Sequence, residues 1–206
     1  IIEGALGCNG YYTESVTVTL MGHDDVSSIA SYDYRDNSGP WITLPAAEPT
    51  FVLGEDGRHI INYRATDLAG NCELGNTIDR PIYIDATAPG SPNDLEVTPP
   101  GWHRENDFSV TWTNPPGDYS GVNGAYYKLE TPPAGADDGQ KQEGMGIFTI
   151  SGITVPIEGQ TPLYVWLEDS ACNADHTTAT SVLLKYDATP PETTIQAERI
   201  PMPSGW

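Results

Sequence analysis

The sequence predicts an all-β protein in which two β-sandwich modules follow one another, and two observations support this prediction. The first is a repeat with an offset of 102 residues. It relates 85–89 (Asp-Ala-Thr-Ala-Pro) to 187–191 (Asp-Ala-Thr-Pro-Pro), and 67–71 (Asp-Leu-Ala-Gly-Asn) to 169–173 (Asp-Ser-Ala-Cys-Asn). The second is the spread of 21 Gly and 18 Pro between short apolar runs, which is typical of turns between strands. Because the repeat is about 100 residues long, each unit is a domain rather than a solenoid turn.

The repeat also predicts the domain organisation. We expect module one at residues 1–86 and module two at residues 87–188. A Gly followed by an aromatic residue occurs at Gly10-Tyr11, Gly101-Trp102 and Gly205-Trp206. The third occurrence indicates that 189–206 is a linker and the first strand of a further module, or an intersubunit strand. Since a lone strand leaves its backbone donors unpaired, we expect this tail to pair with a sheet edge of a neighbouring copy or of a continuation of the chain.

The first half of each module has the two-residue alternation of strands with one buried face. In module one the alternating residues are Val16, Val18 and Leu20, followed by Tyr32 and Tyr34. In module two they are Phe108, Val110 and Trp112, followed by Ala125, Tyr127 and Leu129. Turns at 25–28 and at 118–121 separate the two strands of each module.

The second half of each module continues the alternation. After a turn at 54–57, the expected core face of module one contains His59, Ile61, Tyr63 and Ala65. The offset of the repeat places Leu163, Val165 and Leu167 on the matching face of module two. Closing strands are expected at 81–84 and at 181–186. Roughly seven short strands in about 100 residues, with frequent turns, indicate a β-sandwich.

Three segments of module one resemble the bacterial immunoglobulin-like repeats of large cell-surface and secreted proteins. They are 10–20 (Gly-Tyr-Tyr-Thr-Glu-Ser-Val-Thr-Val-Thr-Leu), 63–71 (Tyr-Arg-Ala-Thr-Asp-Leu-Ala-Gly-Asn) and 85–89. Module two is similar, but Cys172 replaces the Gly of the Ala-Gly-Asn turn, and 131–145 is a Gly-, Pro- and Asp-rich insertion. The resemblance implies tandem immunoglobulin-like or fibronectin type III-like domains that serve as stalk, spacer or adhesive modules. It implies no particular activity, because this fold hosts many functions.

The charge of the chain excludes two classes of partner. Aspartate and glutamate outnumber lysine and arginine 29 to 9, which gives a net charge of −20. Such a surface repels nucleic acid phosphates and anionic membranes, and no apolar run is long enough to span a bilayer. We therefore expect no nucleic acid partner and no membrane insertion. The composition suits a secreted, solvated scaffold, and we expect the chain to be a mature or excised piece of a longer secreted protein.

No motif of a known catalytic type is present. The sequence contains no Gly-x-Ser-x-Gly, no His-Glu-x-x-His and no phosphate-binding loop. The four histidines, His23, His59, His103 and His176, fall on different expected strands and loops. We therefore expect no catalytic residue, no enzymatic activity and no cofactor other than a calcium ion.

The calcium expectation rests on immunoglobulin topology. In that topology the loops after the second and sixth strands share the end that faces the preceding module. This end of module two would gather Asp118 and Asp169, and Asp85 of the linker arrives at the same place. Three carboxylates with nearby carbonyls could hold a hard cation that stiffens the joint. The alternative is that Asp169, like Asp67, only closes an Asx-turn and that Asp85 caps a strand before a stiff linker.

The same topology predicts how the three cysteines pair. Cys8 and Cys72 belong at opposite ends of module one, about 20 Å apart, which exceeds the reach of about 7 Å between the Cα atoms of a disulfide. Cys172, in a turn of module two, faces the Cys8 end of module one. The preferred pairing is an inter-module bond between Cys8 and Cys172. The alternative is a bond between Cys8 and Cys72, with Cys172 free.

One candidate binding surface is aromatic. Tyr164 and Trp166 are out of phase with the core residues of their strand, and Tyr126 is out of phase with the core of the neighbouring strand. These three side chains could form an exposed patch that contacts a partner or stacks on sugar rings. The alternative is that the insertion at 131–145 folds over them.

These features predict a non-catalytic extracellular or cell-surface structural protein: a surface stalk, an adhesin or a head-to-tail fibre subunit. Its expected partners are neighbouring copies or modules of the same protein and, if the aromatic patch is open, a surface glycan. The alternative is a carbohydrate-binding or accessory region of a secreted multidomain enzyme. An open aromatic patch with polar neighbours would favour the alternative.

Overall fold

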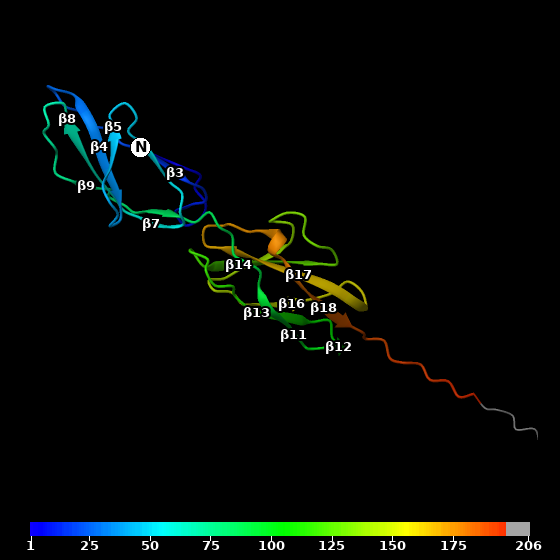
Figure 1. Ribbon diagram of the computed structural model, residues 1–206. Coiled ribbons are helices and arrows are strands. Elements are labelled where there is room, and N and C mark those ends of the chain that lie inside the picture. The colour runs from blue at the N-terminus through cyan, green and yellow to red at the C-terminus, as the bar shows by residue number, and fades with distance from the viewer. Residues whose placement is uncertain (197–206) are drawn as a thin grey trace, which may run out of the picture.

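The computed structural model describes residues 1–196, and Figure 1 shows two all-β modules placed end to end. Within these residues, no helix has the length and apolar character needed to span a bilayer. The chain beyond the last strand, up to residue 196, forms no strand, and Ile195 is 93% exposed. Most of the tail whose strand pairing the sequence predicts, 197–206, lies outside the described residues. That pairing stays a prediction.

Module one has ten short strands. They are β1 (Ile2–Glu3), β2 (Tyr11–Tyr12), β3 (Val16–Thr19), β4 (Ile29–Asp36), β5 (Ile42–Pro45), β6 (Thr50–Leu53), β7 (Gly57–His59), β8 (Ile61–Asp67), β9 (Asn76–Thr77) and β10 (Ile82–Ile84). They form sheets of order β1-β3-β6 and β5-β4-β8-β9, with β2-β10-β7 as a third small sheet. β2 joins β10 in parallel, and the other pairs are antiparallel.

Module two repeats this plan with longer strands. They are β11 (Asn93–Thr98), β12 (Trp102–His103), β13 (Phe108–Thr113), β14 (Val122–Leu129), β15 (Gln140–Glu143), β16 (Thr149–Ile153), β17 (Gly159–Asp169) and β18 (Thr180–Tyr186), with a short 3-10 helix at His176–Thr178. The sheets have the order β11-β13-β16 and β12-β18-β17-β14-β15. β12 lies parallel to β18, as β2 lies parallel to β10.

Each module has its own apolar core between its sheets. Alternate residues of β3 are buried, as are alternate residues of β13. The fully buried residues include Val16, Ile61 and Ile84 in module one, and Phe108, Val110, Leu163, Val165 and Leu167 in module two. The predicted fold class is therefore confirmed: the chain is all-β and consists of tandem immunoglobulin-like β-sandwiches.

Candidate functional site

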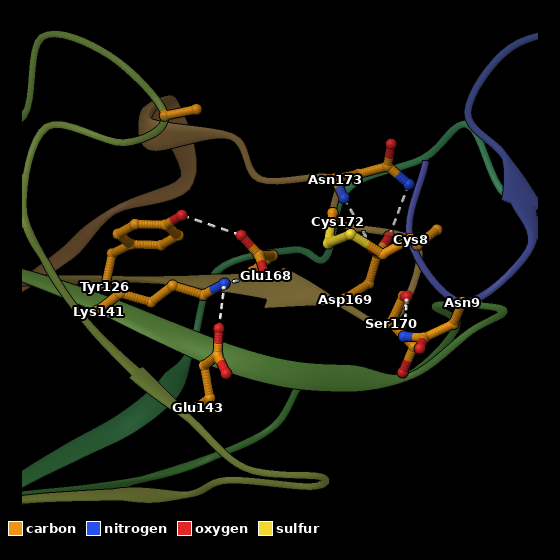
Figure 2. A network of polar contacts seen from close by, with 12 residues as sticks. Cys8, Asn9, Tyr126, Lys141, Glu143, Glu168, Asp169, Ser170, Cys172 and Asn173 are labelled. Atoms are coloured by element: carbon orange, nitrogen blue, oxygen red, sulfur yellow. Dashed lines mark hydrogen bonds and ion pairs between the residues drawn. A yellow bond between two sulfur atoms is a disulfide. The ribbon is translucent and has the colours of Figure 1, made fainter. Parts of the chain in front are cut away.

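The two modules meet at a junction that contains a disulfide bond. Cys8, in the loop between β1 and β2, is bonded to Cys172, in the turn after β17, and their Cα atoms are 5.5 Å apart (Figure 2). Cys72 is exposed and carries a free thiol. The structure therefore contains the inter-module pair that topology favoured, and it does not contain the alternative bond between Cys8 and Cys72.

Two hydrogen bonds between the modules accompany this disulfide. Cys8 N–H donates to the carbonyl of Ala171 at 3.0 Å, and Asn9 Nδ2 donates to the carbonyl of Ser170 at 2.8 Å (Figure 2). The approach at Gly7 is close, because a Cβ atom there would lie 2.3 Å from Ala171 O. Only glycine fits at this position without moving the turn of module two. The loop of module one and this turn therefore fit each other closely.

Asp85 forms the second set of contacts across the junction. This residue follows β10 directly and is fully buried. Its Oδ2 accepts from Ser120 N–H at 2.8 Å, and its backbone carbonyl accepts from Asn173 Nδ2 at 2.8 Å. Tyr11 and Tyr119 meet edge to face beside it, with their ring centroids 6.3 Å apart. Both loops at this end of module two thus contact module one.

The structure brings together the three predicted aspartates. Asp85 comes from the linker, Asp118 from the turn between β13 and β14, and Asp169 from the end of β17. One carboxylate oxygen of each lies within 4.8 Å of the others. Asp85 and Asp169 are fully buried, and Asp118 is half-buried. The topology argument placed all three correctly.

The hydrogen bonds of the alternative interpretation are present as well. Asp169 closes the turn after β17, since its two oxygens accept from N–H and Nδ2 of Asn173, four residues on, each at 2.8 Å. Asp118 Oδ1 accepts from Gly121 N–H at 2.6 Å, and its Oδ2 is buried without a hydrogen-bond partner among the described residues. The turn bonds therefore leave part of this carboxylate unsatisfied.

Burial also makes the negative charges costly. It raises the pKa of Asp169 to about 6, and the charges of Asp85 and Asp118 add to the rise against the opposing bonds from Asn173. Burial likewise raises the pKa of Asp118, against the opposing bond from Gly121. Three crowded carboxylates are stabilised by protons or by a cation. Their oxygens are the ligands that a hard cation such as Ca²⁺ prefers, so the residues fit this class of ion.

The raised pKa of Asp169 predicts a pH dependence in metal-free protein. Because this pKa is about 6 in the folded chain against 3.8 ordinarily, the folded state binds more protons in between. The contribution of Asp169 to the free energy of unfolding is therefore fully present below about pH 4. It is lost as the pH rises through about 6. We expect wild type to lose on the order of 2 to 3 kcal/mol relative to Asp169→Asn between these limits. Denaturant titrations in chelator would measure this; parallel pH profiles of the two proteins would contradict it.

The predicted exposed aromatic patch is wrong. Trp166 is fully buried, and its ring stacks on Tyr126 with the centroids 5.3 Å apart. Its Nε1 donates to the carbonyl of Ala136 at 2.7 Å, and Gly139 lies against the same ring. Tyr126 and Tyr164 are half-buried. The insertion at 131–145 therefore folds over the patch, as the alternative interpretation stated, and Trp166 is part of a second core.

A charged network beneath the insertion was not predicted. Lys141, on β15, lies 2.6 Å from Glu168 Oε1 and 3.0 Å from Glu143 Oε1 (Figure 2). Tyr126 donates its hydroxyl to Glu168 Oε2 at 3.0 Å. Burial opposes the charge of Lys141, but the bonds to Glu168 and Glu143 prevail and raise its pKa. Because Glu168 is 5% exposed, this network fixes β15 onto the sheet. The sequence offered one signal for this network: Glu168 alternates with the core residues of β17, so its side chain belongs to the outer face of the sheet.

His59 has a structural environment. It ends β7, is 7% exposed, and its Nδ1 lies 2.6 Å from Asp36 Oδ2. Its Nε2 lies 2.9 Å from the carbonyl of Glu55, so both ring nitrogens are engaged. This agrees with the expected place of His59 on the core face of module one.

No family model matches the chain, and no curated protein matches it. Similar solved structures include the fibronectin(III)-like modules of Clostridium thermocellum CbhA, at 10% identity over 95% of this chain and 99% of that one, with a TM-score of 0.41. They also include the FN1–FN3 domains of chicken CNTN1, at 15% identity over 90% and 66%, with a TM-score of 0.40. A two-domain fibronectin type III segment of chicken tenascin matches at 14% identity over 90% and 99%, with a TM-score of 0.37.

All three structures are fibronectin type III-like modules in tandem. Because their TM-scores are 0.41 or lower, the fold assignment of this chain rests on its own strand order and cores.

Proposed function

We propose that this chain is a non-catalytic structural unit of an extracellular or cell-surface protein, a spacer whose two modules keep a fixed orientation. The observation that supports it most is the junction, where a disulfide bond and hydrogen bonds from two loops of module two fasten module one. Modules in one chain usually move relative to each other unless their interface is extensive. A disulfide also suits an oxidising compartment. A stalk, an adhesin or a head-to-tail fibre subunit needs such a joint.

A calcium ion held by Asp85, Asp118 and Asp169 belongs to this proposal. The support is the separation of at most 4.8 Å between their oxygens, together with the unpartnered Oδ2 of Asp118. The ion would supply positive charge to three carboxylates from both modules, two of which are fully buried. Its binding would therefore stabilise the joint and each turn that forms it.

We expect calcium to raise the unfolding temperature of the wild-type protein. A ligand that binds only the folded state at about 100 times its dissociation constant adds about 2.7 kcal/mol. Asp169→Asn should remove most of this calcium-dependent rise. Asp175→Asn is the control, because it removes the same charge from another loop of module two that lies outside the cluster. Calorimetry in calcium and in chelator would measure the shift, and equal unfolding temperatures in both would refute the calcium site.

The carbohydrate-binding alternative has less support, because Trp166 is buried beneath the insertion. The junction would serve equally well in a spacer of a secreted enzyme and in a spacer of a surface protein. These two roles differ only in the domains that are attached to the chain. The net charge of −20 disfavours nucleic acid and anionic membranes as partners. A glycan array with the intact chain tests the two functions: we expect no bound glycan, and specific binding abolished by Trp166→Phe would favour the sugar-binding function.

A further inference from the structure

The end of module one that enters the junction is a preorganised linker turn. Asp56 Oδ1 accepts from Ala86 N–H at 2.7 Å, and its Oδ2 accepts from Thr87 Oγ1 at 2.6 Å. Asp85 N–H donates to the carbonyl of Tyr12 at 2.9 Å. These bonds hold Asp85 where module two receives it.

The far end of module two has the same turn. Glu158 replaces Asp56 at the offset of the repeat, and its oxygens accept from Ala188 N–H at 2.9 Å and from Thr189 Oγ1 at 2.7 Å. Asp187 N–H donates to the carbonyl of His103 at 2.9 Å. We call this set, together with Trp102, the outgoing end. It repeats bond for bond the linker turn that module one presents to module two.

The end of module one that points away from module two has the complementary half. Asp67 accepts from Asn71 N–H at 2.7 Å and from Asn71 Nδ2 at 2.8 Å, as Asp169 accepts from Asn173. Leu68 N–H donates to Ser28 O at 3.0 Å, the same distance as between Ser170 N and Gly121 O. We call 24–28 and 67–71 the receptive end. In the junction, Asn173 Nδ2 also donates to the carbonyl of Asp85. By analogy, the second N–H of Asn71 Nδ2 could donate to the carbonyl of a residue equivalent to Asp85.

Within the described residues, the receptive and outgoing ends also expose apolar side chains. Val26 is 94% exposed and Leu68 is 70% exposed on the receptive end, and Trp102 is 56% exposed on the outgoing end. Trp102 pairs with β18 as Tyr11 pairs with β10, and Val26 precedes the positive-φ residue Ser28 as Tyr119 precedes Gly121. Since Tyr11 and Tyr119 contact each other in the junction, Trp102 and Val26 are matched to meet in an equivalent contact.

We propose that the outgoing end of one copy of this chain binds the receptive end of a second copy, in the geometry of the internal junction. The inference rests on the proposed structural function and specifies its partner. A contact between two different surfaces generates a filament when its rotation does not close a ring. Asp187 would join Asp67 as Asp85 joins Asp169, and Asp25 stands at the position of Asp118, so we expect the contact to require a divalent cation.

The disulfide of the junction supplies a direct test. Gly70 occupies the turn position of Cys172, with φ of +87° against +70°. Pro99 precedes Gly101 by two residues, as Cys8 precedes Gly10. In a Cys72→Ser background, one protein carries Gly70→Cys and another carries Pro99→Cys. Mixed with Ca²⁺ and a mild oxidant, they should form a reducible heterodimer at least tenfold faster than either homodimer, and peptide mapping should identify the 70–99 bond.

The control replaces Gly70→Cys with Gly146→Cys, at an exposed glycine of module two with φ of +65°. Cross-linking no faster than in this control would overturn the proposal, and Pro100→Cys serves as a second donor if Pro99→Cys does not fold. Deleting 191–206 should leave the cross-link intact, because Asp187 and Thr189 remain; its loss would mean that the tail is the connector. If the cross-link does not form but the internal junction proves rigid, only the contact between copies is overturned. The spacer function would stand.

Discussion

Replacing Trp166 with alanine should destabilise module two by about 3 to 5 kcal/mol, the usual loss when a fully buried tryptophan is truncated. The indole fills the space between the sheet and the insertion, stacks on Tyr126 and donates to the carbonyl of Ala136. The substitution removes all three contacts and uncovers Glu168 and Lys141. Denaturant titration followed by circular dichroism would measure the loss.

Two further variants show whether the loss of stability comes from the burial of Trp166 or only from the loss of an aromatic ring on this face of β17. Tyr164→Ala lies on the same face but is only half-buried, so its cost should be clearly smaller. Trp166→Phe keeps an aromatic ring and loses one hydrogen bond, which costs about 1 kcal/mol apart from the lost volume. If Trp166→Ala cost less than Tyr164→Ala, the insertion would not cover this side chain in solution.

Removing the disulfide with Cys8→Ser and Cys172→Ser should have the second large effect. The bond joins residues 164 apart, and the chain-entropy model assigns about 5 kcal/mol to a loop of that size. The loop includes most of both modules, so the bond also couples their unfolding. We expect one unfolding transition in the oxidised protein and two separate transitions, at lower temperature, in the double variant. Calorimetry would measure both effects.

Cys72→Ser is the control, because Cys72 is exposed and unbonded and its loss should leave the unfolding curve unchanged. A double variant that unfolds at the wild-type temperature in a single step would show that the hydrogen bonds of Asn9 and Asp85 suffice to couple the modules. The disulfide would then have no mechanical role.

Local patterns and topology predicted much of this structure. The alternation of Val16 and Val18, and of Phe108 and Val110, identifies strands because one face of each sheet is buried. The meeting of Asp85 with Asp169, and of Cys8 with Cys172, follows from which loops share an end of the sandwich. These contacts join residues far apart in sequence, but the fold class alone brings their loops together.

The insertion was harder to predict, for a physical reason. Its path depends on long-range contacts, chiefly Trp166 with Ala136 and Lys141 with Glu168, and no periodicity marks them. The outward phase of Trp166 in β17 correctly excludes it from the main core. Phase alone cannot show that a loop from elsewhere in the module covers that face. The expected sugar-stacking surface was therefore a second, smaller core.

A distance measured across the junction tests most directly whether the junction fixes the orientation of the two modules. Spin labels at Val52→Cys and Ile157→Cys, in a Cys72→Ser background, would report on exposed positions, one in each module. For protein with the Cys8–Cys172 bond and Ca²⁺, the account predicts one narrow distance distribution by double electron–electron resonance, which broadens when Cys8 and Cys172 are both replaced by serine. A broad distribution in the intact protein would contradict it.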